Sequence, residues 1–189
     1  KDFVYIGKHF PRLDTPAKSG PNQLYTLDFV REGMLVAAVK RSPRFGGKLK
    51  SFDATEAKKV PGVREVLQLP SGVAVVAEKT WQAFKAREAL VVEWDDSAAE
   101  MRSSDALFAS FRDAAGKPGL PARKDGDAQG AMAKAVKVIE AEYEFPYLAH
   151  APMEPHDVAI QHKDGKVDVW TGSQFQTVDQ SLTASILGV

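Results

Sequence analysis

The chain has 189 residues, of which 44% are hydrophobic and 26% are charged, and this is an ordinary globular composition. Its 25 Lys and Arg residues balance its 25 Asp and Glu residues, which argues against a general nucleic-acid or acidic-membrane partner. It contains no cysteine, so disulfides, zinc fingers, Cys-ligated clusters and a catalytic thiol are excluded. No apolar run reaches the length that a membrane-spanning helix requires.

The first part of the chain is expected to be an extended arm, residues 1–22, followed by a domain at residues 23–96. Prolines and glycines leave little room for a helix in the arm. The domain shows the element order β-β-β-α-β-β-α-β, which predicts an α+β layer with one mixed sheet and two short helices. The expected strands are 25–29, 34–40, 48–53, 63–69, 73–78 and 91–94, and the expected helices are 54–60 and 80–90.

Local signals support several of these elements. Asp53 is expected to cap the first helix, with Glu56 as its capping-box partner. The nearly continuous apolar run at 73–78 predicts a buried strand. In the second helix, Ala83, Ala86 and Leu90 share one face, and Trp81 and Phe84 are expected to widen its apolar side, which packs on the sheet.

The composition changes after the first domain. Residues 97–126 are rich in turn residues around one helix at 105–115, which indicates a linker lying over the surface. A final unit is expected at 127–189, with a helix capped by Asp127, a strand at 137–147, and a hairpin at 157–170. A last helix is expected at 175–187. This set of elements is too small to cover its own sheet, so the unit is expected to be truncated.

The strand expected at 137–147 has the clearest alternation in the sequence. Its apolar face carries Ile139, Ala141, Tyr143 and Phe145, and its other face carries Glu140, Glu142 and Glu144. The acidic face is expected to be solvated or to pair with basic residues of a neighbour.

The stretch from residue 147 to residue 174 gathers the most unusual residues. His150, Glu154 and His156 could supply the two His and one carboxylate of a zinc site, but the two prolines between them break helical and strand spacing, which favours a turn with surface histidines. Glu154, between Met153 and Pro155, is held in a rigid turn. It could serve as an acid, a base or a substrate anchor, although a role in holding the turn through backbone N–H groups is favoured.

Gln174 follows Thr171, Gly172 and Ser173 at the point where a strand gives way to a helix. The side-chain amide and the backbone N–H groups at such a point can donate to an oxo or anionic group. On residue type alone, an unremarkable position at the start of a helix is favoured. The loop at 45–48, FGGK, lacks the spacing of a phosphate-binding loop, and no G-x-S-x-G motif is present.

An ordered set of segments resembles the aldehyde oxidase/xanthine dehydrogenase family. The arm and the first domain resemble the a/b hammerhead domain of this family in YIGKHFPRLDTPAKSG, GMLVAAVKRSPRFGGKLKSFD, VPGVREVLQL and EALVVEWDD. The last unit resembles the start of the family's molybdenum-cofactor-binding domain in YLAHAPMEPHDVAI and WTGSQFQTVDQSLTASILGV. The segments FGGKLKSFD and YLAHAPMEP most resemble the isoquinoline 1-oxidoreductase beta-subunit type and the related membrane-linked aldehyde dehydrogenases.

This resemblance implies the large subunit of a molybdenum hydroxylase, which uses molybdopterin and takes oxygen from water to hydroxylate an aldehyde or an N-heterocycle. It implies that Gln174, with Ser173 and Gly172, lies at the cofactor, and that Met153 and Glu154 form a turn on the substrate or cofactor side. The implied partners are the remainder of the subunit, an iron–sulfur small subunit and, as a further candidate, a cytochrome c electron acceptor. A periplasmic or membrane-associated location is common among the proteins it resembles.

The chain also departs from the family pattern. The family's glycine-rich GGGFG segment and its catalytic glutamate have no counterpart in these residues, so no catalytic residue and no bound cofactor is expected in the chain alone. We therefore expect an N-terminal fragment that is inactive by itself. The alternative is a stand-alone, non-catalytic binding or assembly module with a hammerhead fold.

Overall fold

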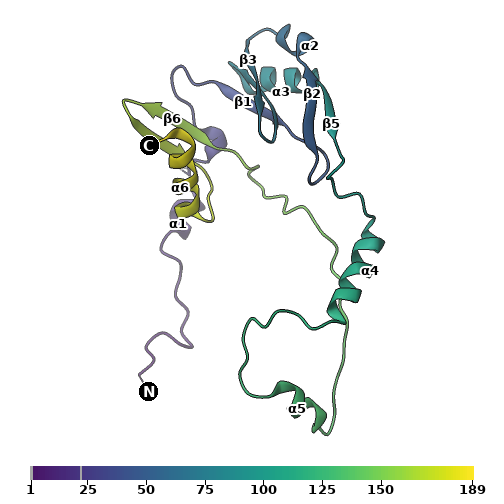
Figure 1. Ribbon diagram of the computed structural model, residues 1–189. Coiled ribbons are helices and arrows are strands. Elements are labelled where there is room, and N and C mark those ends of the chain that lie inside the picture. Colours follow the sequence, from purple (N-terminus) through teal and green to yellow (C-terminus); the bar gives the residue numbers. More distant parts are fainter. Residues whose placement is uncertain (1, 22) are drawn as a thin grey trace. The chain divides into compact units, whose positions relative to one another are not determined.

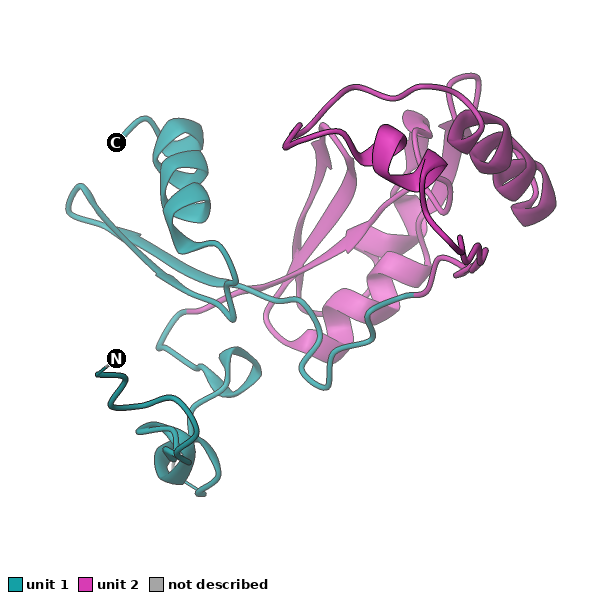
Figure 2. Cartoon of the chain, turned by 90° about the horizontal axis from the view of Figure 1, so that it is seen from below, with its two compact units in different colours: residues 1–33, 149–189 teal, residues 34–148 magenta. Residues whose placement is uncertain are grey.

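The computed structural model describes residues 2–21 and 23–189 and has an α+β fold, as the sequence predicts (Figure 1). The chain divides into two compact units, one formed by residues 1–33 with 149–189 and the other by residues 34–148 (Figure 2). The first unit therefore joins the two ends of the chain. The sequence analysis places domain boundaries at residues 22/23, 96/97 and 126/127, which differ from the limits of these two units. Those boundaries stay a prediction.

The unit of residues 34–148 contains two small antiparallel sheets. One has the strand order β1 (Val36–Lys40), β4 (Gly72–Ala77) and β3 (Val63–Leu69), and the other pairs β2 (Lys48–Asp53) with β5 (Val91–Asp95). The sequence predicts one mixed sheet for this part of the chain, whereas the structure has two separate antiparallel sheets. Strands β3 and β4 are joined by a tight turn, and such a turn can only connect antiparallel neighbours.

The core of this unit forms around the central strand β4. Val73 and Val75 are fully buried, as expected for the apolar run that they belong to. The helices α2 (Thr55–Lys58) and α3 (Thr80–Glu88) pack beside the strands, and Ala83 and Ala86 of α3 are fully buried. Their small side chains allow the helix to approach the sheet closely. This confirms the predicted face of Ala83 and Ala86, whereas Trp81 and Phe84, which were expected to widen it, are exposed.

Three local expectations for this part of the chain and the arm are wrong. Residues 25–29 form no strand, because the 3-10 helix η1 (Thr26–Asp28) interrupts them, and the arm contains a short helix, α1 (Thr15–Lys18). The N-cap of α2 is Ala54 rather than Asp53, whose carboxylate instead accepts hydrogen bonds from the N–H and hydroxyl of Thr55. The expected capping box with Glu56 is therefore replaced by a local turn around Asp53.

The second half of the same unit has two helices and a long irregular segment. Helix α4 (Ser104–Ala115) is capped by the Ser103 hydroxyl, and α5 (Ala128–Ala133) is capped by the Asp127 carboxylate, as predicted for Asp127. The strand expected at 137–147 is absent, since residues 136–148 belong to no helix or strand (Figure 1). A strand needs a paired neighbour, and no described segment of the chain supplies one here.

The unit of residues 1–33 and 149–189 is built on a hairpin. Strands β6 (Ala159–Lys163) and β7 (Lys166–Trp170) are joined at Asp164 and Gly165, both of which have positive φ. This confirms the predicted turn. Helix α6 (Gln176–Leu187) follows and ends at Gly188, which has a φ of 70°, as expected for a glycine stop. Among the described residues, no helix combines the length and the apolar character needed to span a membrane.

Candidate functional site

The most distinctive surface lies in the unit formed by the two chain ends, around the Glu154 turn. The Glu154 side chain is half-buried, and its Oε1 accepts a hydrogen bond from the Leu27 N–H at 3.3 Å. The role favoured from the sequence, a carboxylate that pairs with backbone N–H, is therefore what the structure contains. The N–H group, however, belongs to a segment 127 residues away along the chain rather than to the turn itself.

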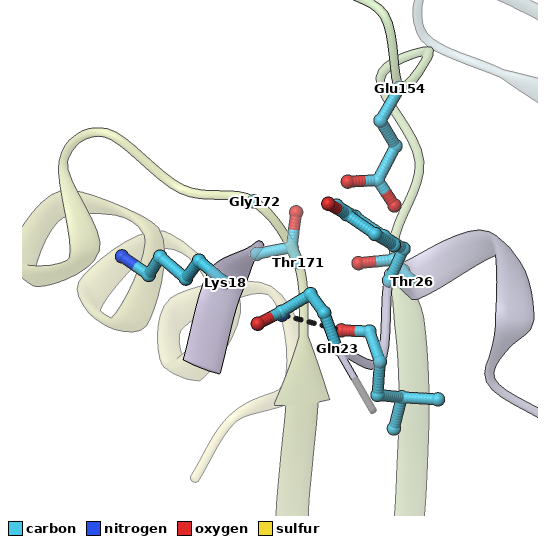
Figure 3. Close-up of a pocket in the computed structure, with 8 residues that line it drawn as sticks. Lys18, Gln23, Thr26, Glu154, Thr171 and Gly172 are labelled. Atoms are coloured by element: carbon cyan, nitrogen blue, oxygen red, sulfur yellow. Dashed lines mark hydrogen bonds between the residues drawn. The ribbon is translucent and has the colours of Figure 1, made fainter. Parts of the chain in front are cut away.

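An open hollow of about 270 Å³ lies beside Glu154 (Figure 3). Its wall is formed by residues from both ends of the chain: Lys18, Gln23, Leu24, Tyr25, Thr26, Glu154, Thr171 and Gly172. The amine of Lys18 is paired with Asp14 at 2.6 Å, and it points away from Glu154 in Figure 3. The other polar side chains of the wall are hydroxyls and one amide, which can both donate and accept hydrogen bonds.

Aromatic stacking holds the two ends of the chain together beside this hollow. Phe29, only 6% exposed, stacks on Trp170 of β7 with ring centroids 4.3 Å apart. The Arg31 guanidinium lies 4.5 Å from the centroid of the Phe29 ring and 5.8 Å from that of Trp170. This stack of two rings and a cation fixes residues 29–31 against the hairpin, and with them the wall of the hollow.

A second carboxylate of the turn, Asp157, has a perturbed pKa. Its partial burial, followed by the nearby negative charge of Glu154, raises the pKa of Asp157 above its ordinary value. The backbone carbonyl of Asp157 accepts a hydrogen bond from the Thr171 hydroxyl at 2.9 Å. The turn is thereby tied to the end of β7, where the next candidate residues begin.

The segment between β7 and α6 presents Gly172, Ser173 and Gln174. The Ser173 hydroxyl is engaged with the Asp179 carboxylate and accepts the Phe175 N–H at 3.0 Å. The Gln174 side chain is exposed and forms no hydrogen bond with the rest of the described chain. A Cβ placed on Gly172 would have only the Glu154 Oε2 within 4 Å, at 3.9 Å, so the backbone there is open to approach.

These contacts test whether the segment could face a cofactor. Gln174 has two free amide donors, and Gly172 lets a ligand come close to the backbone, so both fit such a role. Ser173 does not fit as a side-chain donor, because its hydroxyl already donates to Asp179. Within the structure, only Gly172 of these three also lines the hollow beside Glu154.

The remaining candidates of the turn are less organised. Met153 is fully exposed, and His150 and His156 are exposed as well. In the described ranges, no group of three or more His, Asp or Glu side chains is arranged so that it could hold a metal ion. The geometry thus gives no support to the zinc-site alternative at His150, Glu154 and His156.

The sequence did not point to the residues that the arm brings to the hollow. Lys18, Gln23, Tyr25 and Thr26 lie in a segment expected to be an extended arm and a strand, and nothing in their types or spacing marks a site. The only signal in the sequence was a carboxylate, Glu154, in a Pro-flanked turn, and it did not indicate which part of the chain would supply the donor.

Comparison with known proteins identifies the class. Residues 114–189 match the family model described as the molybdopterin cofactor-binding domain. Together with the curated relatives described next, this match supports a molybdopterin-binding protein of the xanthine oxidase family. The resemblance found in the sequence is thereby confirmed.

Two curated relatives extend this match over almost the whole chain. The chain is 34% identical to the beta subunit of isoquinoline 1-oxidoreductase from Brevundimonas diminuta, over 97% of this chain and 25% of that protein. It is 28% identical to a subunit of nicotinate dehydrogenase from Pseudomonas putida, over 92% of this chain and 15% of that protein. The chain therefore spans a quarter or less of the length of these relatives.

Solved structures share the fold at lower identity. The Cu,Mo-CO dehydrogenase matches with a TM-score of 0.66 and 20% identity, over 96% of this chain and 29% of that chain. Quinoline 2-oxidoreductase from Pseudomonas putida 86 matches with a TM-score of 0.60 and 20% identity, over 92% of this chain and 27% of that chain. Both are similar in fold to this chain.

Proposed function

We propose that residues 1–189 are part of the large subunit of a molybdenum hydroxylase, and that they act only within the whole protein. The observation that carries this proposal is the match of residues 114–189 to a molybdopterin cofactor-binding domain, which includes the exposed Gln174. The substrate class is an aldehyde or an N-heterocycle. The names of two curated relatives refer to isoquinoline and nicotinate, whereas a third, 34% identical over 88% of this chain, is named a membrane-bound aldehyde dehydrogenase, so both substrate classes are kept.

In this proposal, molybdenum bound to molybdopterin supplies the two-electron oxidation that converts a substrate C–H and water into C–OH, two protons and two electrons. An iron–sulfur small subunit would accept these electrons. The part played by this chain is positioning. Gln174 would hold the bound cofactor through its amide N–H groups, and Gly172 would give the cofactor access to the backbone.

Contacts of the turn around Glu154 help to fix the segment that carries Gly172 and Gln174. Thr171 donates to the Asp157 carbonyl, which fixes the end of β7 two residues before Ser173. Glu154 in turn holds Leu27 of the N-terminal segment. We infer that Glu154 acts through this support, as a positioning residue, and that Met153 belongs to the same turn without a contact of its own.

The proposal is tested with the whole protein, purified with its small subunit and incubated with an N-heterocycle or an aldehyde in ¹⁸O-labelled water. The expected product carries ¹⁸O. Gln174→Ala should lower kcat at least about tenfold, as expected when one donor to a reacting group is lost. Gln180→Ala is the matched control, since Gln180 is an exposed residue of α6 without a described partner, and it should leave kcat unchanged.

The outcomes are separable. A product without ¹⁸O would contradict hydroxylation by water. Equal losses in the two glutamine variants would contradict the role of Gln174. A folded whole protein that oxidises neither substrate class would favour the alternative of a non-catalytic binding or assembly module.

A further inference from the structure

The segment of residues 139–145 has the sequence pattern of a strand but no strand partner. Ile139, Tyr143 and Phe145 alternate along it and are 81%, 77% and 79% exposed. Within the described chain, the N–H and C=O groups of residues 136–148 form no backbone–backbone hydrogen bonds. One apolar face and the backbone of this segment are therefore open to a partner.

The opposite, acidic face is already occupied inside the chain. Arg112 of α4 pairs through its Nε with Glu142 at 3.0 Å and through its Nη2 with Glu144. The ring of Phe111, also on α4, makes an edge contact with Tyr147 at a centroid distance of 6.3 Å. These contacts hold residues 142–147 against α4, so less conformational entropy is lost when a partner strand binds.

We propose that residues 139–145 accept a β-strand along their backbone, and that this strand comes from the part of the same subunit outside residues 1–189. This inference rests on the proposed function, in which the chain is one part of a larger subunit. The inference is supported by a difference in length. The match to the beta subunit of isoquinoline 1-oxidoreductase includes 97% of this chain but only 25% of that protein. The remaining three-quarters of such a subunit can supply the strand.

The chemistry of the segment also specifies the partner strand. Its residues opposite Ile139, Tyr143 and Phe145 should be apolar, so that the exposed face is buried. Its residue opposite Glu140 should be neutral or basic, because Glu140 has no ion pair with any described residue. Strand addition of this kind takes its affinity from the backbone and its specificity from alternate side chains.

A second copy of the same segment fits poorly. An antiparallel pair centred on Glu142 places Glu142 opposite its own copy and Glu140 opposite Glu144, and like charges directly opposite each other are destabilising. A shift of the register by one residue places the glutamates opposite Tyr143 and its apolar neighbours. The apolar face of one copy then lies opposite the acidic face of the other. The triple acidic face thus argues against self-association.

Hydrogen exchange on the whole protein tests the proposal. Amides of residues 139–145 should exchange at least about 100-fold more slowly than in an unstructured peptide, as in a paired strand. Ala141→Pro should abolish this protection, because proline removes an N–H from the ladder. Ala122→Pro is the matched control in an exposed irregular segment, and it should leave the protection intact.

A photoreactive side chain placed at position 141 identifies the source of the strand, and a crosslink within the same polypeptide is expected. Free exchange at residues 139–145 in the folded protein would overturn the proposal, and so would a crosslink to a second copy or to another subunit. If Ala141→Pro prevents folding, the proposal is tested by the hydrogen exchange of the wild-type protein and by the crosslink alone. Molybdenum content measured on the same sample separates the two claims: metal without protection contradicts only the strand, and protection without metal contradicts only the function.

Discussion

Glu154 shows how a single side chain joins distant parts of the sequence. Its carboxylate reaches the Leu27 N–H and also raises the pKa of Asp157, although burial of Asp157 is the larger cause. The sequence predicted that Glu154 would accept from backbone N–H groups, because a carboxylate in a Pro-flanked turn needs a donor. It could not predict which N–H, since that depends on the arm folding back onto the hairpin.

The coupling between Glu154 and Asp157 gives a test at the residue scale. Glu154→Gln removes the negative charge but keeps an oxygen that can accept from Leu27. The pKa of Asp157 should therefore fall towards its ordinary value, while remaining above it because burial persists. Carboxyl NMR titration measures this shift. An unchanged titration of Asp157 would show that the charge of Glu154 does not act on it.

The same pKa sets a dependence of stability on pH. Because the folded state raises the pKa of Asp157, its contribution to stability is present below the unfolded pKa and is lost as the pH rises through the folded value. Asp157→Asn should therefore stabilise the protein more at pH ~7 than at pH ~3, in denaturant titrations compared with wild type. Asp168→Asn, on the exposed strand β7, is the control. An equal effect of Asp157→Asn at both pH values would refute this linkage.

At the scale of elements, the structure of residues 34–96 follows the sequence closely. Strand β4 and helix α3 were predicted because an apolar run and a repeated small-residue face leave few alternatives. Their packing adds a contact that the pattern did not reveal. The Lys40 amine on β1 donates to the carbonyls of Leu90 at 3.0 Å and Arg87 at 3.4 Å, at the end of α3.

Lys40 is therefore expected to stabilise the end of α3. Lys40→Met keeps the apolar stem but leaves those carbonyls without their charged donor, which costs about 1–2 kcal/mol. Amides of α3 should then exchange roughly 5–30-fold faster. Lys85→Met, on the exposed side of the same helix, should leave exchange unchanged. Equal exchange in the Lys40 variant and the wild type would show that the cap contributes nothing.

The two strands that were predicted wrongly share one physical cause. The strands expected at 25–29 and 137–147 have the correct alternation, yet neither has a neighbouring strand in the described chain. Alternation reports which face will be buried, whereas pairing depends on segments elsewhere. The hairpin at Asp164 and Gly165 was predicted correctly because its partner strand is local and its turn residues fix the register.

At the scale of the whole molecule, the family was recognised from ordered segments and is supported by the matches described above. The candidate site was predicted only in part. Gln174 was selected by resemblance, and its exposed, unpaired amide agrees with a role toward a ligand. The hollow beside Glu154 could not be predicted, since five of its eight lining residues come from the N-terminal segment.

The most direct test of the central claim is the molybdenum and pterin content of the whole protein. The protein should be purified from a host that makes the cofactor and also loads a known molybdenum enzyme, as the control. The account predicts about one molybdenum and one pterin per large subunit, and a clear loss of both when residues 114–189 are deleted. A folded whole protein that contains neither, from a host in which the control enzyme is loaded, would contradict it.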